Sequence, residues 1–208
     1  MSELFTRDLR SLLEAIADPS PAPGAGAVAG LVTAMAAGVI ASAARRSTAW
    51  PEARGVSAQA QALRSRVEKL AEANEQAYLK ALGLLEVTQP GDSRDIAGGS
   101  RDIADGSRDI AIGRALEAAA NLPLAIAEAA YDVALLGAEA AEHAVAGCAE
   151  DGAAASLLAE AAARAAAGLV ATNLVSSPGD DRVVHAQRLA AAATDAARRA
   201  VTAAATAT

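Results

Sequence analysis

The chain has 208 residues, of which 53% are hydrophobic and 2% aromatic, and its formal net charge at pH 7 is −7. The negative charge excludes a basic nucleic-acid-binding surface, and the single cysteine, Cys148, excludes an intramolecular disulfide framework. Most of the hydrophobic residues are alanine, which favours helices but buries little area, so we expect one all-α domain over residues 1–208 that buries further helix faces as a homodimer.

The first predicted helix is amphipathic and ends near Ala17, because Asp18 and Pro19 follow it. Its apolar residues share one face: Leu9, Leu12, Leu13 and Ile16. Acidic and basic residues are mixed from the start, so this segment has no apolar signal core. Together with the lone cysteine, this predicts a cytoplasmic protein.

A turn rich in proline and glycine, residues 21–26, leads into the second predicted helix, Gly26 to Ser47. The first N–H groups of such a helix have no intrahelical partner, and they suit an anionic or carbonyl-bearing ligand. Glycine allows the ligand to approach the backbone closely. The candidate ligand-contacting residues are Pro23, Gly24 and Gly26. A plain turn before a core helix is the alternative interpretation.

Residues 25–44 carry no charge and are long enough to cross a bilayer, and Gly26 and Gly30 have the spacing of a membrane-helix packing motif. Alanine and glycine are only marginally lipophilic, however, and no aromatic belt flanks both ends of the run. We therefore expect an enclosed central helix and no membrane association. Arg45 and Arg46 close this helix.

A third helix is predicted over residues 51–87, with one buried stripe formed by Leu63, Val67, Leu70, Ala77 and Leu82. Three copies of Ser-Arg-Asp-Ile-Ala follow within residues 93–111, at a period of seven. Glycines between the copies disfavour a helix by about 1 kcal/mol each, so we expect a loop that becomes helical towards Ile110. A lengthened connection and a ligand- or partner-binding loop are both open interpretations of this repeat.

The fourth helix is predicted over residues 107–146, with a kink or restart at residues 121–123. A turn over residues 147–152 follows, in which Asp151 is placed to cap the next helix, Ala153 to Val175. The last helix begins at Asp180 or Asp181. The pattern predicts an antiparallel bundle of about six helices around two central helices that are rich in alanine and glycine.

The sequence contains no recognisable catalytic or metal-binding signature. His143 and His185 are far apart in the sequence and belong to no recognisable metal-binding motif, so we expect surface positions for both and no metal. A phosphate-binding loop, a nucleophile elbow and a dinucleotide fingerprint are also missing from the sequence.

The order of features, however, resembles the cyclodeaminase/cyclohydrolase family of folate enzymes. This family includes the C-terminal domain of formiminotransferase-cyclodeaminase and free-standing methenyltetrahydrofolate cyclohydrolases. The similar features are the leading amphipathic helix, the Pro-x-Pro-Gly-x-Gly turn, and three later stretches: Glu72 to Tyr78, Ala118 to Leu124, and Glu150 to Leu174. The resemblance covers nearly the whole chain in the right order.

The resemblance implies a tetrahydrofolate derivative as substrate and no metal. Either a formimino group cyclises to the methenyl bridge with release of ammonia, or water opens that bridge. Both reactions pass through a tetrahedral carbon. A positioned acid or base can transfer the necessary protons, and fixed dipoles can stabilise the charge that develops. The implied roles are catalysis by Asp151 and Asn74, and folate binding by the remaining candidates: Pro23, Gly24, Gly26, Arg45, Arg46 and Asn173.

Two positions depart from the family pattern. Ala27 stands where a serine is usual, and Asn74 stands where an aspartate is usual. A neighbouring acid, Glu72 or Glu75, replaces the lost carboxylate only if the helix brings it to the same place. A catalytically degenerate protein that binds folate or a partner is therefore the alternative function. A structural interpretation is also open for residues at helix ends. Arg45 and Arg46 can be solvated charges at the end of a helix, and Asp151 can be a helix cap.

Overall fold

A computed structural model describes residues 4–19, 23–86, 101–145, 147–175, 177 and 179–207. Within these residues the chain forms six α-helices and no β-strand. The helices are α1 (Leu9–Ala17), α2 (Ala25–Arg46), α3 (Ala53–Glu86), α4 (Arg101–His143), α5 (Ala149–Asn173) and α6 (Asp181–Thr206). The predicted all-α class and the six-helix bundle are confirmed.

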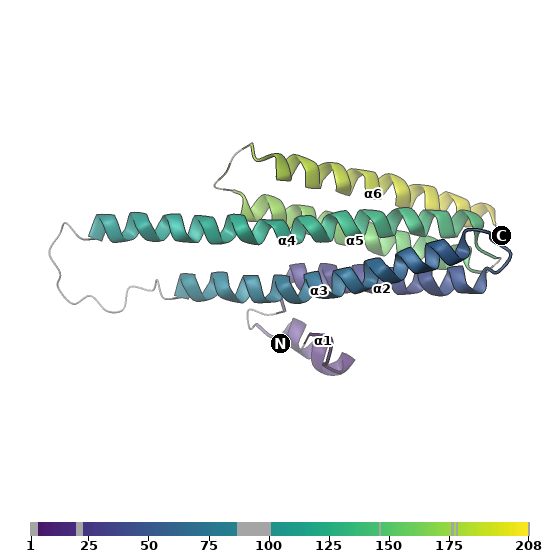
Figure 1. The fold of residues 1–208 in the computed structure, drawn as a ribbon, viewed down its shortest axis with the longest axis horizontal. Helices are drawn as coiled ribbons and strands as arrows, with labels where there is room; N and C mark the ends of the chain where they lie inside the picture. The colour runs from purple at the N-terminus through teal and green to yellow at the C-terminus, as the bar shows by residue number, and fades with distance from the viewer. Residues whose placement is uncertain are drawn as a thin grey trace.

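Helices α2 to α6 form an elongated bundle, and α1 lies to one side of it (Figure 1). Helices α3 and α4 extend past the others at the end of the molecule away from the C-terminus. The turn between α2 and α3 lies at the opposite end, close to the C-terminus. Arg46, the last residue of α2, is bonded to Asp151 in the first turn of α5, so α2 and α5 run antiparallel.

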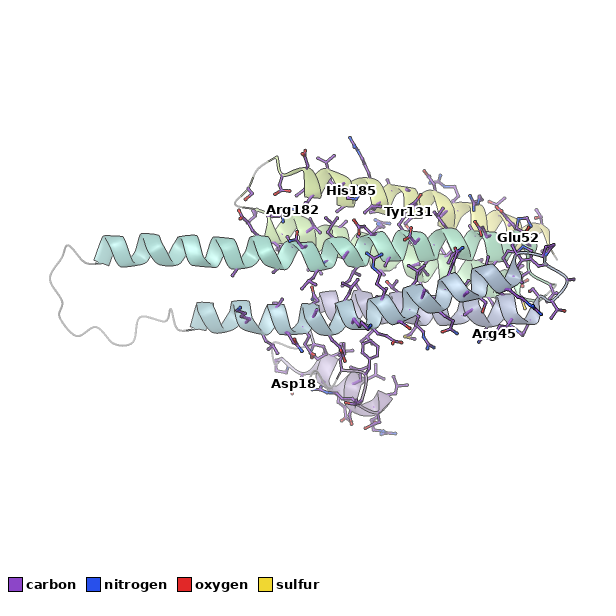
Figure 2. The ribbon with its side chains drawn as sticks, in the orientation of Figure 1. Asp18, Arg45, Glu52, Tyr131, Arg182 and His185 are labelled. Carbon is purple, nitrogen blue, oxygen red and sulfur yellow. The ribbon has the colours of Figure 1, made fainter. Side chains whose placement is uncertain are left out.

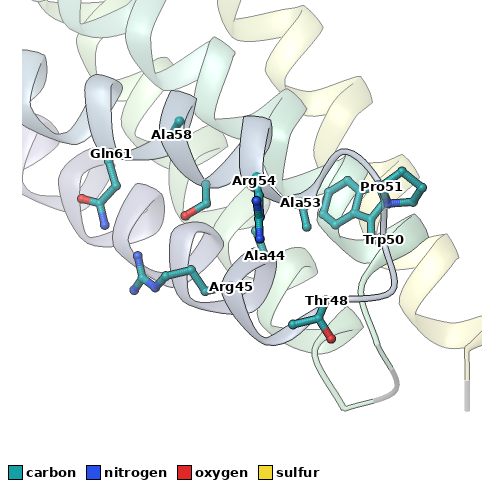
Figure 3. Close-up of a pocket in the computed structure, with 10 residues that line it drawn as sticks. Ala44, Arg45, Thr48, Trp50, Pro51, Ala53, Arg54, Ala58 and Gln61 are labelled. Carbon is teal, nitrogen blue, oxygen red and sulfur yellow. The ribbon is translucent and has the colours of Figure 1, made fainter.

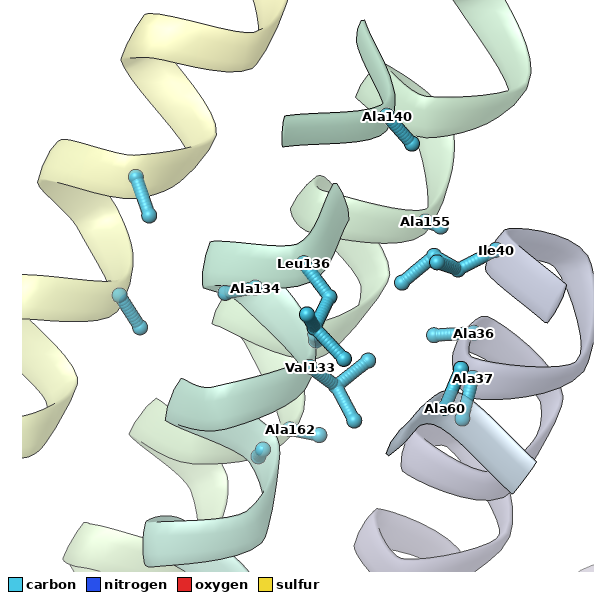
Figure 4. Packing of buried hydrophobic residues seen from close by; sticks show 14 of the residues in the cluster. Ala36, Ala37, Ile40, Ala60, Val133, Ala134, Leu136, Ala140, Ala155 and Ala162 are labelled. Atoms are coloured by element: carbon cyan, nitrogen blue, oxygen red, sulfur yellow. The ribbon is translucent and has the colours of Figure 1, made fainter. Parts of the chain in front are cut away.

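The core consists mainly of alanines, with a few larger side chains between them (Figure 4). Ile40, Val133 and Leu136 point into the space between α2 and α4. Helices approach closely where residues are small: a Cβ added to Gly152 would lie 2.5 Å from the backbone nitrogen of Ala141. Small residues replace large anchors here, because dispersion contacts grow with close approach between helices.

The predicted stripe on α3 agrees with the structure where its side chains are described. Val67 is fully buried, and Leu63 and Leu70 pack against the main core cluster. The amphipathic face predicted for α1 behaves differently. Leu12 is half-buried and contacts the small cluster around Leu4, whereas Leu9 remains 71% exposed.

The prediction that the fourth helix starts at residue 107 is wrong, and of the kink or restart predicted at residues 121–123 the restart is wrong. Helix α4 begins at Arg101 and continues through Pro123 without a break. Pro123 is fully buried, so packing of its ring offsets the hydrogen bond that a proline cannot donate. The repeat therefore lies inside α4 from residue 101 onwards, and its residues 93–100 lie outside the described part of the chain.

The prediction that Asp151 caps the fifth helix is also wrong. The helix begins at Ala149, and its N-cap position is Cys148, which makes no side-chain capping bond. Asp151 instead lies inside the first turn, where a carboxylate interacts favourably with the helix dipole. At the start of α6 the cap is Asp180, whose carboxylate accepts a hydrogen bond from the Arg182 backbone N–H at 2.9 Å.

Three helical segments are long and apolar enough to cross a membrane by length and composition: Ala25–Arg46, Ala119–His143 and Ala149–Asn173. In the bundle, 61%, 50% and 50% of their most apolar windows are buried. Contacts between helices of this one chain therefore use at least half of each apolar window.

Candidate functional site

The start of α2 carries the glycine turn that the sequence singled out. Gly24 is the N-cap residue, in extended conformation, and it has no side chain to bond the first N–H groups. Its carbonyl accepts the N–H of Val28 at 3.2 Å. The N–H groups of residues 25–27 precede that first helical bond, so the positive end of α2 lies at this turn. Pro23 is buried and Gly24 half-buried. We call this region the α2 entrance.

Asn74 of α3 covers the α2 entrance. A Cβ added to Gly26 would lie 2.2 Å from Nδ2 of Asn74, a separation that real Cβ atoms do not show. One turn later, a Cβ on Gly30 would lie 2.7 Å from the Cβ of Ala71. Glycine at these two positions therefore permits α3 to approach α2. The contact brings together the two motifs whose residues were predicted to share one site.

Glu75 follows Asn74 on the buried side of α3. It is 8% exposed, and it is the only charged side chain in the buried class among the residues that the structure describes. It lies one helical turn after Ala71, which is fully buried beside Ala27. Glu72 is only half-buried. Of the two acids proposed to replace the usual aspartate, Glu75 is the one held inside the bundle.

Ala27, at the position where the family pattern has a serine, is fully buried in a small cluster with Leu4 and Ala71. Its side chain points into protein contacts and away from solvent. The departure at this position therefore removes a hydroxyl from the helix packing beneath the entrance.

Asn173 lies at the same level of the bundle as the α2 entrance. Gly24 precedes Arg46 by 22 residues, and Asn173 follows Asp151 by 22 residues (46 − 24 and 173 − 151). Because α2 and α5 run antiparallel from the Arg46–Asp151 contact, equal rise brings Asn173 level with Gly24. Asn173 is half-buried at the end of α5.

The other three predicted site residues lie at the far end of α2. Arg46 bonds Asp151, and the side chains of this pair are 54% and 42% exposed. Arg45, beside them, is near the turn that leads into α3 (Figure 2). At about 1.5 Å per residue, this end is roughly 33 Å from the entrance. The single site predicted from the sequence is therefore divided: within one subunit, Asn74 and Asp151 do not meet the same reacting atom.

The remaining titratable groups lie away from the entrance. His143 is tilted against the ring of Trp50, with centroids 5.7 Å apart, and His185 lies 3.6 Å from the Glu128 carboxylate. Both histidines are more than half exposed, as predicted. Burial raises the pKa of Asp132 on α4, although the nearby charge of Arg66 opposes the shift. Across the described residues, no group of three or more potential ligands is arranged to hold a metal ion.

Comparisons with known proteins bear on this geometry. A family model described as formiminotransferase-cyclodeaminase matches residues 8–194. Among solved structures, formiminotetrahydrofolate cyclodeaminase from Thermotoga maritima superposes with a TM-score of 0.78 at 19% sequence identity, covering 97% of each chain. At that identity the superposition shows a shared fold. Among curated protein sequences, none matches the chain significantly.

Proposed function

The chain belongs to the formiminotransferase-cyclodeaminase family, and from this premise we propose that it is a folate-dependent one-carbon enzyme with its site at the α2 entrance. The observation that carries the proposal is the contact between Gly26 and Asn74, which joins two motifs of the family pattern. The substrate class we infer is a tetrahydrofolate with a one-carbon unit. The reaction is formimino cyclodeamination or hydrolysis of the methenyl bridge.

The proposed chemistry needs little from the protein beyond positioning and a proton carrier. In cyclodeamination, one folate nitrogen attacks the formimino carbon on the other, and the tetrahedral carbon then expels ammonia. In hydrolysis, water adds to the bridge carbon, and one carbon–nitrogen bond then breaks. Each sequence moves a proton onto a leaving nitrogen, a step for which a positioned carboxyl group is suited.

We assign the proton-carrying role to Glu75 and a positioning role to Asn74. An amide donates and accepts hydrogen bonds but neither gains nor loses a proton near neutral pH, so Asn74 alone cannot replace the acid–base function of the usual aspartate. The buried Glu75 carboxylate follows directly on the same helix. In this proposal, the N–H groups at the start of α2 donate hydrogen bonds to a carbonyl of the pteridine ring.

Asn173 stays in the proposed site as a hydrogen-bonding residue, because it lies level with the entrance. We also keep Pro23, Gly24 and Gly26 as the backbone wall of the proposed site. The proposed site does not include Asp151, which the resemblance implied for catalysis, or Arg45 and Arg46, which it implied for folate binding, since these residues lie at the opposite end of α2.

Turnover by purified variants tests this assignment. Ammonia release from formiminotetrahydrofolate and absorbance loss of methenyltetrahydrofolate above its spontaneous rate measure the two reactions. We expect Glu75→Gln to lower turnover by about 10²- to 10⁴-fold, the usual contribution of a general acid or base. Asp151→Asn, which removes a carboxylate at the other end, serves as the matched control and keeps turnover. Loss of turnover in Asp151→Asn with retention in Glu75→Gln contradicts the assignment.

A catalytically degenerate, folate- or partner-binding protein is the second candidate, favoured by Ala27 and Asn74 at the two departures from the family pattern. Calorimetric titration with 5-formyltetrahydrofolate separates the two. Binding without turnover of either substrate identifies the degenerate protein, and binding with turnover identifies the enzyme.

We also propose a cytoplasmic homodimer that needs no metal and no membrane. The alanine-rich core supports a dimer, because small side chains bury little area in one subunit and exposed apolar residues such as Leu9 and Met35 remain. Light scattering of purified protein measures the assembly, and recovery without detergent tests the absence of membrane association.

A further inference from the structure

A cavity of about 660 Å³ lies between the C-terminal end of α2 and the first turns of α3, far from the α2 entrance (Figure 3). Its volume is within the range of about 300–1,000 Å³ typical of small-molecule sites. Figure 3 shows Gln61 and Arg45 at one end of the lining, Arg54 in the middle, and Thr48 beside the rings of Trp50 and Pro51 at the other end. The lining residues are Ala44, Arg45, Thr48, Trp50, Pro51, Ala53, Arg54, Ser57, Ala58 and Gln61.

The charge of this lining is entirely positive. Arg45 and Arg54 contribute guanidinium groups, and no lining residue is acidic. Within the part of the chain that the structure describes, neither arginine takes part in a salt bridge, whereas the adjacent Arg46 is bonded to Asp151. The nearest acid in sequence, Glu52, is exposed and does not line the cavity. Both arginines are exposed residues that line the cavity, so their guanidinium groups are accessible to a ligand.

The position of Arg54 adds a second, independent observation. It is the second residue of α3, and the first turn of that helix contains no acidic residue. A cation at a helix N-terminus interacts unfavourably with the helix dipole, by up to about 1 kcal/mol. The charge of Arg54 therefore gains nothing from the dipole of this helix. Instead, the charge of Arg54 and the positive end of α3 both make the electrostatic potential at the cavity more positive. A positive potential favours the binding of an anion.

The remaining lining provides hydrogen bonds and an apolar wall. The Ser57 hydroxyl is buried and donates to the Ala41 carbonyl at 3.3 Å, so its lone pairs are left to accept hydrogen bonds. The Gln61 amide, half-buried, can donate or accept. Trp50 is 8% exposed and fixed within the main core cluster, so its ring is a preformed surface.

We propose that this cavity is a binding site for a small oxyanion ligand, a carboxylate or phosphate on a compact apolar body, separate from the α2 entrance. Arginine forks bind both oxyanions through charge-assisted hydrogen bonds. Arg45 lies 21 residues after Gly24 on one helix (45 − 24), or roughly 31 Å away. A ligand in the cavity therefore leaves the entrance of the same subunit open.

The single tryptophan of the chain provides the readout, because Trp50 lines the cavity and no other tryptophan contributes fluorescence. Phenyl phosphate and benzoate serve as probes that share an apolar ring and differ in the oxyanion, and inorganic phosphate tests the anion alone. We expect a saturable fluorescence change with at least one ring-bearing anion and no change with benzylamine, which has the same ring and the opposite charge. Calorimetry of the same titrations detects binding that leaves the fluorescence unaltered.

Matched arginine variants make the test specific. Arg45→Gln and Arg54→Gln should each weaken binding by about ten- to a hundredfold, the loss of one hydrogen bond to a charged group. Arg198→Gln removes the same charge from an exposed position on α6 and should leave affinity unchanged. All three variants are checked for an unaltered thermal midpoint. Equal weakening in Arg198→Gln, or no binding of any of the three anions by either method, overturns the proposal.

Competition with 5-formyltetrahydrofolate tests the separation from the folate site. If the two sites are distinct, the folate binds without displacing the anion that binds here. Displacement of the anion by the folate overturns the claim of a separate site, and it leaves the proposed enzymatic activity to be judged by turnover alone.

Discussion

The two ends of α2 differ in how closely the helix approaches α3. At the entrance, Gly26 and Gly30 lie so close to Asn74 and Ala71 that no Cβ fits between the helices. At the other end, Arg45 and the first turns of α3 line a cavity of about 660 Å³. At the entrance, glycine lets a side chain of α3 lie directly against α2, whereas the residues at the other end leave space for a ligand.

The largest expected effect is a loss of turnover, caused by a substitution at the α2 entrance, where α2 and α3 are in close contact. In Gly26→Ala the new methyl group would overlap the Asn74 amide, so that flexible side chain must move away from the entrance. A displacement of about 1 Å in a positioning group can cost roughly a hundredfold in rate. We expect a fall of that order in turnover relative to wild type. Turnover within twofold of wild type would show that the position of Asn74 does not matter.

A smaller effect is expected one turn later, and it falls on stability. Gly30→Ala places a methyl group 2.7 Å from the Ala71 Cβ and 3.3 Å from its Cα, and neither atom can rotate away. Overpacking costs about 1–3 kcal/mol, of which alanine recovers up to about 1 kcal/mol through helix propensity. We expect urea unfolding to show a net loss in the free energy of unfolding.

Gly38→Ala is the matched control for this variant, because a Cβ there would meet nothing within 4 Å. It should stabilise the protein by about 0.5–1 kcal/mol. Equal effects of the two substitutions would contradict the close approach at Gly30.

At the C-terminal end of α2, beside the cavity, the buried hydroxyl of Ser47 joins two parts of the bundle. The Ser47 side chain donates to the Ala43 carbonyl at 2.8 Å and accepts the Val145 N–H at 3.0 Å, which joins the α2–α3 turn to the end of α4. Ser47→Ala leaves that N–H without this partner, so we expect a loss of about 1 kcal/mol in the free energy of unfolding. Ser42→Ala, exposed on the same helix, should change it by less than about 0.5 kcal/mol.

The smallest expected effect is on the thermal stability of the protein at acidic pH. Hydrogen bonds from Arg182 lower the pKa of Asp180 from 3.8 to about 2. A carboxyl group with a lowered folded-state pKa contributes stability above its unfolded pKa, and this contribution is lost as the pH falls through the folded value. Thermal midpoints of the wild type should therefore decline between pH 3.8 and about 2, and Asp180→Asn should show a shallower decline. Parallel pH profiles would show that the cap does not contribute.

Helix boundaries were predictable where local signals decide them. The stop of α1 at Ala17 follows from Asp18-Pro19, and the start of α6 follows from Asp180. The continuation of α4 through Pro123 was not predictable, because the compensation comes from burial of the ring by other helices. Sequence position alone does not show that burial.

The candidate site was predictable only in part, for the same reason. The glycine turn and the acid-rich stretch of α3 were each visible, but their meeting depends on the α2–α3 register. Asp151 looked suited to the same site, yet the antiparallel order of α2 and α5 places it at the opposite end. The cavity beside Trp50 had no signal in the sequence, since its two arginines come from different helices.

Amide hydrogen exchange with and without 5-formyltetrahydrofolate tests the location of the folate site most directly. We predict slower exchange in peptides covering residues 24–30 and 71–78, with little change over residues 44–61. Protection confined to residues 44–61 would contradict the placement of the folate site at the α2 entrance.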